Sequence, residues 1–261
     1  MITLLSPAKS MLNGCDMASS AEHAQPRFCE NTKHIVSLMM RYSTAELAEI
    51  FKISTPLAQE LRLRFTALYE AFSGVEGGAV AAPAVCLYDG VVFKHFKNKR
   101  EFAAEEAAYL QKYVRISSLL WGVLRPFDEI LPYRMEGYVR LAGDDVRVDR
   151  YWRDVQTEAF VSEIKDSGGV LLYLASKEEQ SAFHWNEVKK AVRVIDIKFY
   201  QQKAGKLKQV VVYAKMARGE MIRYMIEHKT QDPEQLKSFE WSGYTYQESL
   251  STPDEWVWLM Q

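Results

Sequence analysis

The chain has 261 residues, of which 48% are hydrophobic and 26% are charged, a composition that is ordinary for a folded globular protein. Its 33 basic and 34 acidic side chains leave a formal net charge of −1. This balance excludes a global positive field, so any nucleic acid would have to be held by a local basic patch.

Three features of the sequence favour a cytoplasmic location. Cys15, Cys29 and Cys86 are odd in number and widely spaced, so we expect reduced thiols rather than a disulfide framework. The start of the chain has no basic region, and its apolar run stops at Ser6-Pro7, which does not fit a signal peptide. No apolar run approaches the roughly 20 residues that a membrane span requires. We expect a monomer that makes no contact with a membrane.

Ile2–Leu5 is a short apolar run that predicts a strand, and residues 11–30 show no periodicity and predict a loop. Three helices are expected next. Ser43 and Glu46 have the spacing of a capping box, which opens the second helix. The third begins at Thr55, as N-cap, and Pro56.

Only Lys52, Ile53 and Ser54 separate the second and third helices, so these helices predict a tight helix–turn–helix unit. Residues 74–78 are rich in glycine but lack the lysine of a phosphate-binding loop, and we interpret them as a linker.

The middle of the chain is expected to contain one strand and one long helix. Residues 84–88 form an apolar run that predicts the strand. Asn98 and Glu101 again have capping-box spacing, and the apolar stripe that follows them predicts a helix that ends near Gly122.

The last part of the chain mixes helices and strands. Residues 170–174 are continuously apolar, which is typical of a strand buried on both faces. Residues 192–199 and 207–214 flank a polar segment and predict a hairpin. Further helices are expected over residues 151–164 and 217–228 and from Asp232.

Strands and helices alternate without a regular βαβ order. We therefore predict an α+β fold in which residues 1–261 form a single compact unit, with a mixed β-sheet flanked by helices.

A dense cluster of charges follows the predicted long helix, in residues 124–136. Two prolines fix the course of a loop that carries Arg125, Arg134 and three carboxylates. The planar fork of arginine suits phosphate or carboxylate. Asp128 and Glu136 could instead pair with the two arginines and only brace the loop, and the residue types leave both interpretations open.

Other charged residues are expected at the ends of strands. Lys9 follows the first strand, and Lys215 and Arg218 fall where the hairpin leads into a helix, whose N-terminus attracts anions. Ser176 and Glu178 follow the buried strand, at an edge where open sheets bind ligands. A lone lysine is more often simply solvated, which is the alternative interpretation of Lys9 and Lys215.

No pattern in the sequence indicates a metal or a cofactor, and we expect neither. The five histidines show no H-E-x-x-H spacing and no paired cysteines, and the chain has no G-x-S-x-G or G-x-G-x-x-G motif.

Four segments resemble, in order and spacing, the peroxide stress protein YaaA family: SPAK, LLWGVLRPFDEILPYRME, LASKE and YAKMARGEMIRYMIE. The similarity extends from Ile2 to about Tyr246. The resemblance implies a compact α+β fold, a cytosolic role in resisting hydrogen peroxide by limiting free intracellular iron, and DNA binding.

The family's DNA-binding element is described as a helix-hairpin-helix beside a positively charged cleft, and residues 45–68 would correspond to it. Such hairpins hold phosphates through backbone N–H groups at a helix N-terminus, without reading bases. The candidate DNA contacts are Lys52, Ile53, Ser54, Arg62 and Arg64.

Two functions therefore compete. The first is a protective protein that binds DNA without sequence specificity, with an affinity that falls steeply with salt. The second is an enzyme acting on a small phosphorylated or carboxylated ligand, because a DNA binder has no need of glutamates and a serine among its cations. A direct iron chelator is a third option, but the sequence offers no convincing set of ligands.

For the enzyme, the candidate catalytic residues are Glu136, Glu178 and Ser176. The candidate anion-binding residues are Lys9, Arg125, Asp128, Tyr133, Arg134, Lys215 and Arg218.

Overall fold

The computed structural model describes residues 1–14, 24–76, 78–97, 101–143, 145–203 and 205–260. Within them, eight strands form one sheet in the order β4-β3-β1-β6-β7-β10-β9, with β8 paired to β7. These strands are β1 Ile2–Leu5, β3 Val114–Ser118, β4 Gly122–Leu124, β6 Val170–Tyr173, β7 Arg193–Lys203, β8 Lys206–Lys208, β9 Tyr244–Tyr246 and β10 Glu255–Met260. A separate pair joins β2 Ala82–Pro83 and β5 Glu129–Ile130.

The sheet is parallel at its centre and antiparallel at its margins. β1 pairs in parallel with β3 and β6, and β7 pairs in parallel with β6 and β10, whereas β4, β8 and β9 each pair antiparallel. Leu5 lies opposite Ile116, Leu4 opposite Tyr173, and Tyr173 opposite Asp196. The carboxyl ends of β1, β3 and β6 therefore meet at one edge of the sheet.

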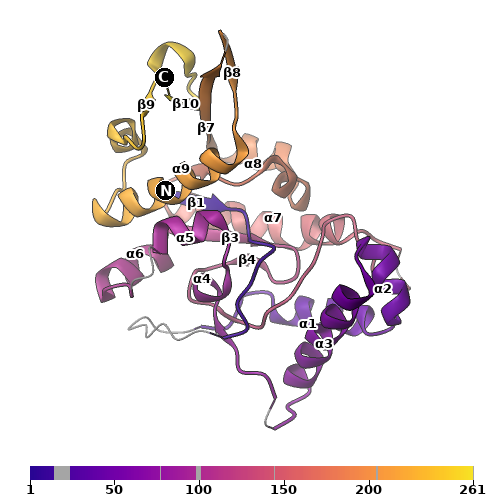
Figure 1. Ribbon diagram of the computed structural model, residues 1–261. Coiled ribbons are helices and arrows are strands. Elements are labelled where there is room, and N and C mark those ends of the chain that lie inside the picture. Colours follow the sequence, from indigo (N-terminus) through magenta and orange to yellow (C-terminus); the bar gives the residue numbers. More distant parts are fainter. Residues whose placement is uncertain (15–23, 77, 98–100, 144, 204, 261) are drawn as a thin grey trace.

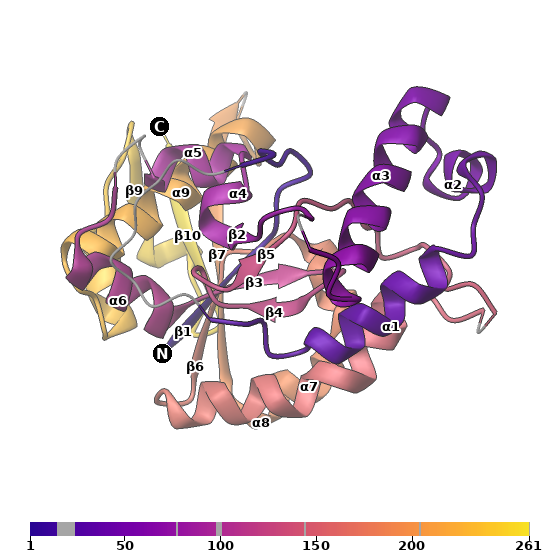
Figure 2. The same cartoon turned by 90° about the horizontal axis from the view of Figure 1, so that it is seen from below.

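Helices cover both faces of this sheet. In Figure 2, α7 and α8 lie along one side of the strands, and α4, α5 and α9 lie on the other. α1, α2 and α3 gather beyond β4, and the β7–β8 hairpin projects from the rest of the molecule (Figure 1). The helices are α1 Cys29–Met39, α2 Thr44–Phe51, α3 Thr55–Phe72, α4 Ala84–Leu87, α5 Val91–Lys97, α6 Ala104–Tyr113, α7 Val148–Asp166, α8 Trp185–Ala191 and α9 Val211–Glu227, with 3₁₀ helices η1 Lys177–Ala182, η2 Pro233–Ser238 and η3 Glu248–Leu250.

One hydrophobic cluster joins all these layers. It includes Phe65 of α3, Trp152 of α7 and Trp258 of β10, each of which is fully buried. The prediction of an α+β fold in one compact unit, with a mixed sheet flanked by helices, is confirmed.

Several predicted elements are also confirmed. β1 and β6 lie where the apolar runs placed them, and α7 covers the predicted helix. The capping box that opens α2 is present, because Glu46 N–H donates to Ser43 Oγ and Ser43 N–H donates to Glu46 Oε2. α3 begins one residue earlier than expected, with Ser54 rather than Thr55 as its N-cap.

The predicted long helix after Asn98 is wrong. Asn98 itself lies outside the described residues, α6 ends at Tyr113, and the chain continues as β3. Val114 and Ile116 in β3 are β-branched, and β3 bonds to β1 on one side and β4 on the other. The pairing of strands thus overrides a helical stripe of apolar residues.

Two further predictions fail at short apolar runs. Residues 84–87 form the buried helix α4 instead of a strand, because periodicity cannot separate the two in a run this short. The second hairpin strand ends at Lys208, and α9 begins at Val211. Lys215 and Arg218 therefore lie within α9 rather than at the end of a strand.

The expectation of reduced thiols holds for Cys29, which is free, but not for Cys86, which is disulfide-bonded. No helix among the described residues is long and apolar enough to cross a bilayer.

Candidate functional site

The charged stretch of residues 124–136 is divided between two places in the fold. β4 runs antiparallel to β3, with Leu124 opposite Ile116 and Gly122 opposite Ser118, so Arg125 lies toward the amino end of β3. Three residues of a strand span about 10 Å. Arg125 is therefore separated from the carboxyl edge of the sheet.

Arg125 and Asp128 bond to each other. Asp128 is buried and accepts hydrogen bonds from Arg125 N–H at 2.8 Å and Arg125 Nε at 2.9 Å. Burial raises the pKa of the Asp128 carboxyl, and Arg125 opposes this rise. These contacts match the alternative in which this pair braces the loop.

Arg134, Glu136 and Lys9 form a second charged group. The Glu136 carboxylate lies 3.0 Å from Lys9 Nζ and 3.3 Å from Arg134 Nη2. One carboxylate between two cations leaves a net positive charge. The buried Arg134 Nε finds no acceptor among the described residues.

Tyr133 reaches the carboxyl end of β3. Its hydroxyl lies 2.7 Å from Ser118 Oγ and 2.7 Å from the Tyr88 hydroxyl, and all three side chains are buried. Burial raises the pKa of Tyr133 to about 12. Tyr133 therefore serves as a neutral hydrogen-bonding group at this edge rather than as an anion.

Glu179, on η1, is the most perturbed carboxyl at the same edge. It is only 7% exposed, and Ser176 Oγ donates to its Oε1 at 3.5 Å, while its Oε2 has no partner among the described residues. Burial raises the pKa of Glu179 to about 7. The nearby Ser117 hydroxyl lowers the pKa of Glu179, although the distance and angles between the two groups do not meet the criteria for a hydrogen bond.

A cavity of about 800 Å³ opens beside Ser176, a size typical of sites for small molecules. We call it the α9 pocket. It is bounded by the end of β6, η1, α8, β7, the start of α9 and the residues before β10. Ser176, Lys215 and Arg218 line it, so the structure brings these three predicted site residues together.

Arg218 lines the α9 pocket without a partner among the described residues. Within the described residues it forms no ion pair, and its buried Nε donates no hydrogen bond. Burial lowers the pKa of Arg218, and Asp196 acts in the opposite direction. Asp196 itself bonds to Lys198 Nζ at 2.6 Å.

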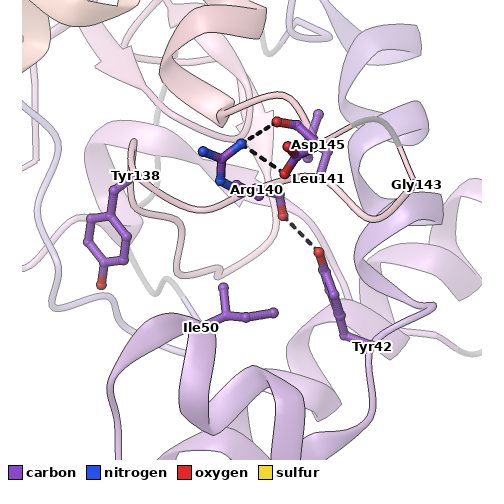
Figure 3. A pocket seen from close by; sticks show the side chains of 7 residues that line it. All are labelled: Tyr42, Ile50, Tyr138, Arg140, Leu141, Gly143 and Asp145. Atoms are coloured by element: carbon purple, nitrogen blue, oxygen red, sulfur yellow. Dashed lines mark hydrogen bonds and ion pairs between the residues drawn. The ribbon is translucent and has the colours of Figure 1, made fainter.

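A second cavity, of about 370 Å³, provides a contrast (Figure 3). It lies between the start and end of α2 and residues 138–145, and Arg140 lines it. Arg140 Nη1 donates to the Asp145 carboxylate at 2.8 Å, and the Arg140 carbonyl accepts from the Tyr42 hydroxyl at 3.2 Å. The polar groups of this cavity satisfy one another, unlike Arg218.

The predicted DNA contacts lie on and beside the α2–α3 turn. Lys52 is exposed in the left-handed conformation, with its Nζ 5.7 Å from the centre of the Tyr138 ring. Ser54 is exposed, and Ile53 packs against the core.

The two predicted arginines make internal contacts. Arg62 Nη1 donates to the carbonyls of Met40 and Tyr42, and Arg64 bonds to Glu60 and to the Tyr133 carbonyl. Their role toward DNA stays a prediction.

The predicted catalytic residue Glu178 is exposed, whereas its neighbour Glu179 is buried beside the site. Glu178 and not Glu179 was selected from the sequence as a candidate, and a catalytic role for Glu178 stays a prediction. The signal that was available is the position of Glu179 three residues after Ser176, behind a buried strand. Ser6, Ser117, Ser118 and Tyr88 were missed, since nothing in their local sequence distinguishes them.

No group of three or more histidine, cysteine, aspartate or glutamate side chains that could hold a metal ion is found among the described residues.

A family model described as peroxide stress protein YaaA matches residues 1–250 of the chain. The chain is 38% identical over 262 residues to a UPF0246 protein of Parabacteroides distasonis, covering 100% of both proteins. It is 38% identical over 259 residues to a UPF0246 protein of Bacteroides fragilis, covering 98% of this chain and 97% of that relative. A UPF0246 protein of Hahella chejuensis is 33% identical over 259 residues, covering 98% of each.

Proposed function

Because the chain belongs to the peroxide stress protein YaaA family, we propose that it acts in the cytoplasm in the defence against peroxide. We propose further that the α9 pocket is its working site and binds a small anionic ligand. Limiting intracellular free iron, which the family resemblance implies, is the cellular outcome that we assign to this activity.

The unpaired guanidinium of Arg218 carries this proposal. A buried charge without a partner is costly, and native structures pair such groups. Asp196, whose carboxylate opposes the lowering of the Arg218 pKa, bonds to Lys198 instead. A phosphate or carboxylate would supply the missing acceptors in the two-pronged geometry that arginine favours.

Lys215 adds a second positive charge. It is exposed, lines the same pocket and precedes Arg218 by three residues on α9, which places both side chains on one face of the helix. The ligand would therefore meet two cations from a single rigid element.

The test is thermal unfolding with inorganic phosphate. A ligand that binds only the folded chain stabilises it by about 2.7 kcal/mol at 100 times its dissociation constant. We expect phosphate to raise the unfolding temperature of the wild type and of R140M, whose arginine is already paired, and to leave that of R218M unchanged. Equal shifts in R218M and the wild type, or no shift in any chain, would overturn the proposal.

A cellular experiment connects the pocket to peroxide. In a strain that lacks the protein, the wild type and R140M should restore survival in hydrogen peroxide and low free iron, and R218M should restore neither. Full rescue by R218M would separate the α9 pocket from the stress response.

Binding of DNA through the α2–α3 turn is the second candidate, and the start of α3 favours it. Ser54 makes no side-chain cap, and the first turn of α3 contains no acidic residue. The first residues of α3 are exposed, beside the exposed Lys52. Free N–H groups and a helix dipole at this position suit a phosphate of the DNA backbone.

Gel-shift titrations over a range of salt test this candidate. Binding should weaken as salt rises, and K52A should bind less tightly and show a shallower salt slope. K190A, which removes an exposed lysine of α8, is the matched control and should bind as the wild type does. No retention at low salt, or equal retention of K52A, would exclude the α2–α3 turn as the DNA site.

A further inference from the structure

Ser176 lies between the carboxyl end of β6 and the start of η1, and hydrogen bonds fix its backbone. It follows β6 and lines the α9 pocket. Its N–H donates to Ser6 Oγ at 2.7 Å, and its carbonyl accepts from the Tyr173 hydroxyl at 2.5 Å. These two bonds hold the backbone of Ser176 on both sides. The Ser176 hydroxyl donates to Glu179 Oε1 at 3.5 Å.

Glu179 has the surroundings of a proton acceptor. Among the described residues it has no ion pair, and one of its oxygens has no hydrogen-bond partner. The groups that act on it are the hydroxyls of Ser6, Ser117 and Ser176 and the Glu178 carboxylate. Tyr88, Tyr133 and Tyr173 interact with it electrostatically and are themselves kept neutral by burial. No cation in this set neutralises the carboxylate.

A second serine–glutamate pair in the same chain shows what a purely structural pair looks like. Ser43 and Glu46 have the same spacing of three residues, but Glu46 is exposed and accepts hydrogen bonds from both the N–H and the hydroxyl of Ser43 at 2.7 Å. These bonds lower the pKa of Glu46. Glu179 receives no bond from the N–H of Ser176, which goes to Ser6, and its pKa is raised by burial.

The anion site shares the α9 pocket with Ser176, and Glu179, which does not line this pocket, is joined to it through its hydrogen bond with Ser176. Arg218 and Ser176 both line it, and Tyr173, whose hydroxyl bonds to Ser176, interacts electrostatically with Arg218. We propose that Ser176 is a nucleophile and Glu179 its general base, and that the pair cleaves a phosphate ester bound by Arg218 and Lys215. This inference rests on the proposed function, since the same site binds the ester.

The chemical step is a transfer of the phosphoryl group to Ser176. The Ser176 Oγ lone pair forms the new O–P bond while the bond from phosphorus to the ester oxygen breaks, and that oxygen leaves with the bonding pair. The Oγ proton passes to the Glu179 carboxylate. Arg218 binds the oxygens that carry the negative charge.

An alkyl fluorophosphonate tests the nucleophile directly, because it forms an O–P bond with an activated serine and releases fluoride. The labelled site is identified by mass spectrometry of peptides at pH 8, where Glu179 is ionised. We expect Ser176 to be labelled and Ser43, the matched serine with a structural glutamate, to stay unlabelled. Inorganic phosphate should slow the labelling by occupying the adjacent anion site.

Three variants complete the experiment. S176A should lose the label, and E179Q should slow labelling by at least about 100-fold, the usual contribution of a general base. E158Q removes an exposed carboxylate of α7 that does not line the α9 pocket, and it should be labelled at the wild-type rate. In the wild type the rate should rise as the pH increases through about 7, where Glu179 loses its proton.

The outcomes separate this inference from the proposed function. Absence of label on Ser176, or equal rates in E179Q and the wild type, overturns the nucleophile–base pair even if phosphate still stabilises all four chains. The probe is uncharged and does not need the anion site. Labelling of Ser176 that depends on Glu179 therefore supports the pair even if phosphate binding fails.

Discussion

The Glu179 carboxyl makes the stability of the fold depend on pH. Its pKa is about 7 in the folded chain, against an ordinary value of 4.5. Between these two values the folded chain binds more protons than the unfolded chain, so stability falls as the pH rises from about 4.5 to 7 and stays lower above. The cost at pH 8 is on the order of 3 kcal/mol.

E179Q should therefore be more stable than the wild type at pH 8 and similar to it at pH 5, as measured by urea unfolding at both values. Glutamine keeps the size of the side chain and carries no charge to bury. E158Q, at an exposed position of α7, serves as the control and should unfold as the wild type does at both pH values. A gain in stability that is equal at pH 5 and pH 8 would show that Glu179 is not the titrating group.

At the residue scale, the sequence identified some of the residues that line the α9 pocket and not others, and their chemical roles stay predictions. Lys215, Arg218 and Ser176 were selected as residue types at expected chain positions, and they line one pocket. Glu179 was not selected, because its burial depends on packing at the sheet edge that no local pattern records. Arg125 was included, and only the antiparallel pairing of β4 reveals that it lies elsewhere.

The contact between α5 and α9 depends on Gly219, which follows Arg218 in α9. A Cβ at this position would meet the Val92 carbonyl oxygen at 2.4 Å and His95 Cβ at 2.6 Å. The Val92 backbone cannot move away from an added Cβ as easily as a flexible side chain could. Overpacking of a core typically lowers the free energy of unfolding by about 1–3 kcal/mol.

We expect G219A to lose about 2 kcal/mol of unfolding free energy in urea, despite the better helix propensity of alanine. A Cβ added at Gly14 would meet no atom within 4 Å, so G14A is the matched control and should change the unfolding free energy little. A stable G219A would mean that α5 and α9 can move apart without cost.

At the element scale, prediction succeeded where the local sequence itself marks the start or the extent of a helix or strand. The capping box of α2, the proline at the start of α3 and the strand runs of β1 and β6 all signal locally. It failed at residues 114–124, where the chain changes from helix to strand because β1 and β4 offer hydrogen bonds. β1 lies more than 100 residues before β3 in the chain, so the local sequence around β3 does not show that this partner is available.

On the scale of the whole molecule, the site exists only because the sheet is parallel at its centre. Parallel pairing aligns the ends of β1, β3 and β6, and so brings Ser6, Ser117 and Ser176 to one edge. The helices on the two faces then close the edge, with η1 supplying Glu179 and α9 supplying Arg218. Assembly of the site therefore requires the complete fold.

Unfolding should accordingly be a single event, including α1, α2 and α3, which look peripheral in Figure 1. Phe65 of α3 is fully buried in the same hydrophobic cluster as Trp258 of β10, and Phe72 of α3 packs on Trp121 with ring centres 5.8 Å apart. F65A should remove about 4 kcal/mol from the unfolding free energy of the whole chain.

The measurement is urea unfolding followed by tryptophan fluorescence and by far-ultraviolet circular dichroism. In the wild type and in F65A the two signals should give one shared midpoint, which is lower in F65A, because a defect in α3 weakens the cluster that also holds β10. L63A, at an exposed position of α3, should leave the midpoint unchanged. If F65A instead showed two separate transitions, the three helices would unfold independently, and the α2–α3 turn could act without the α9 pocket.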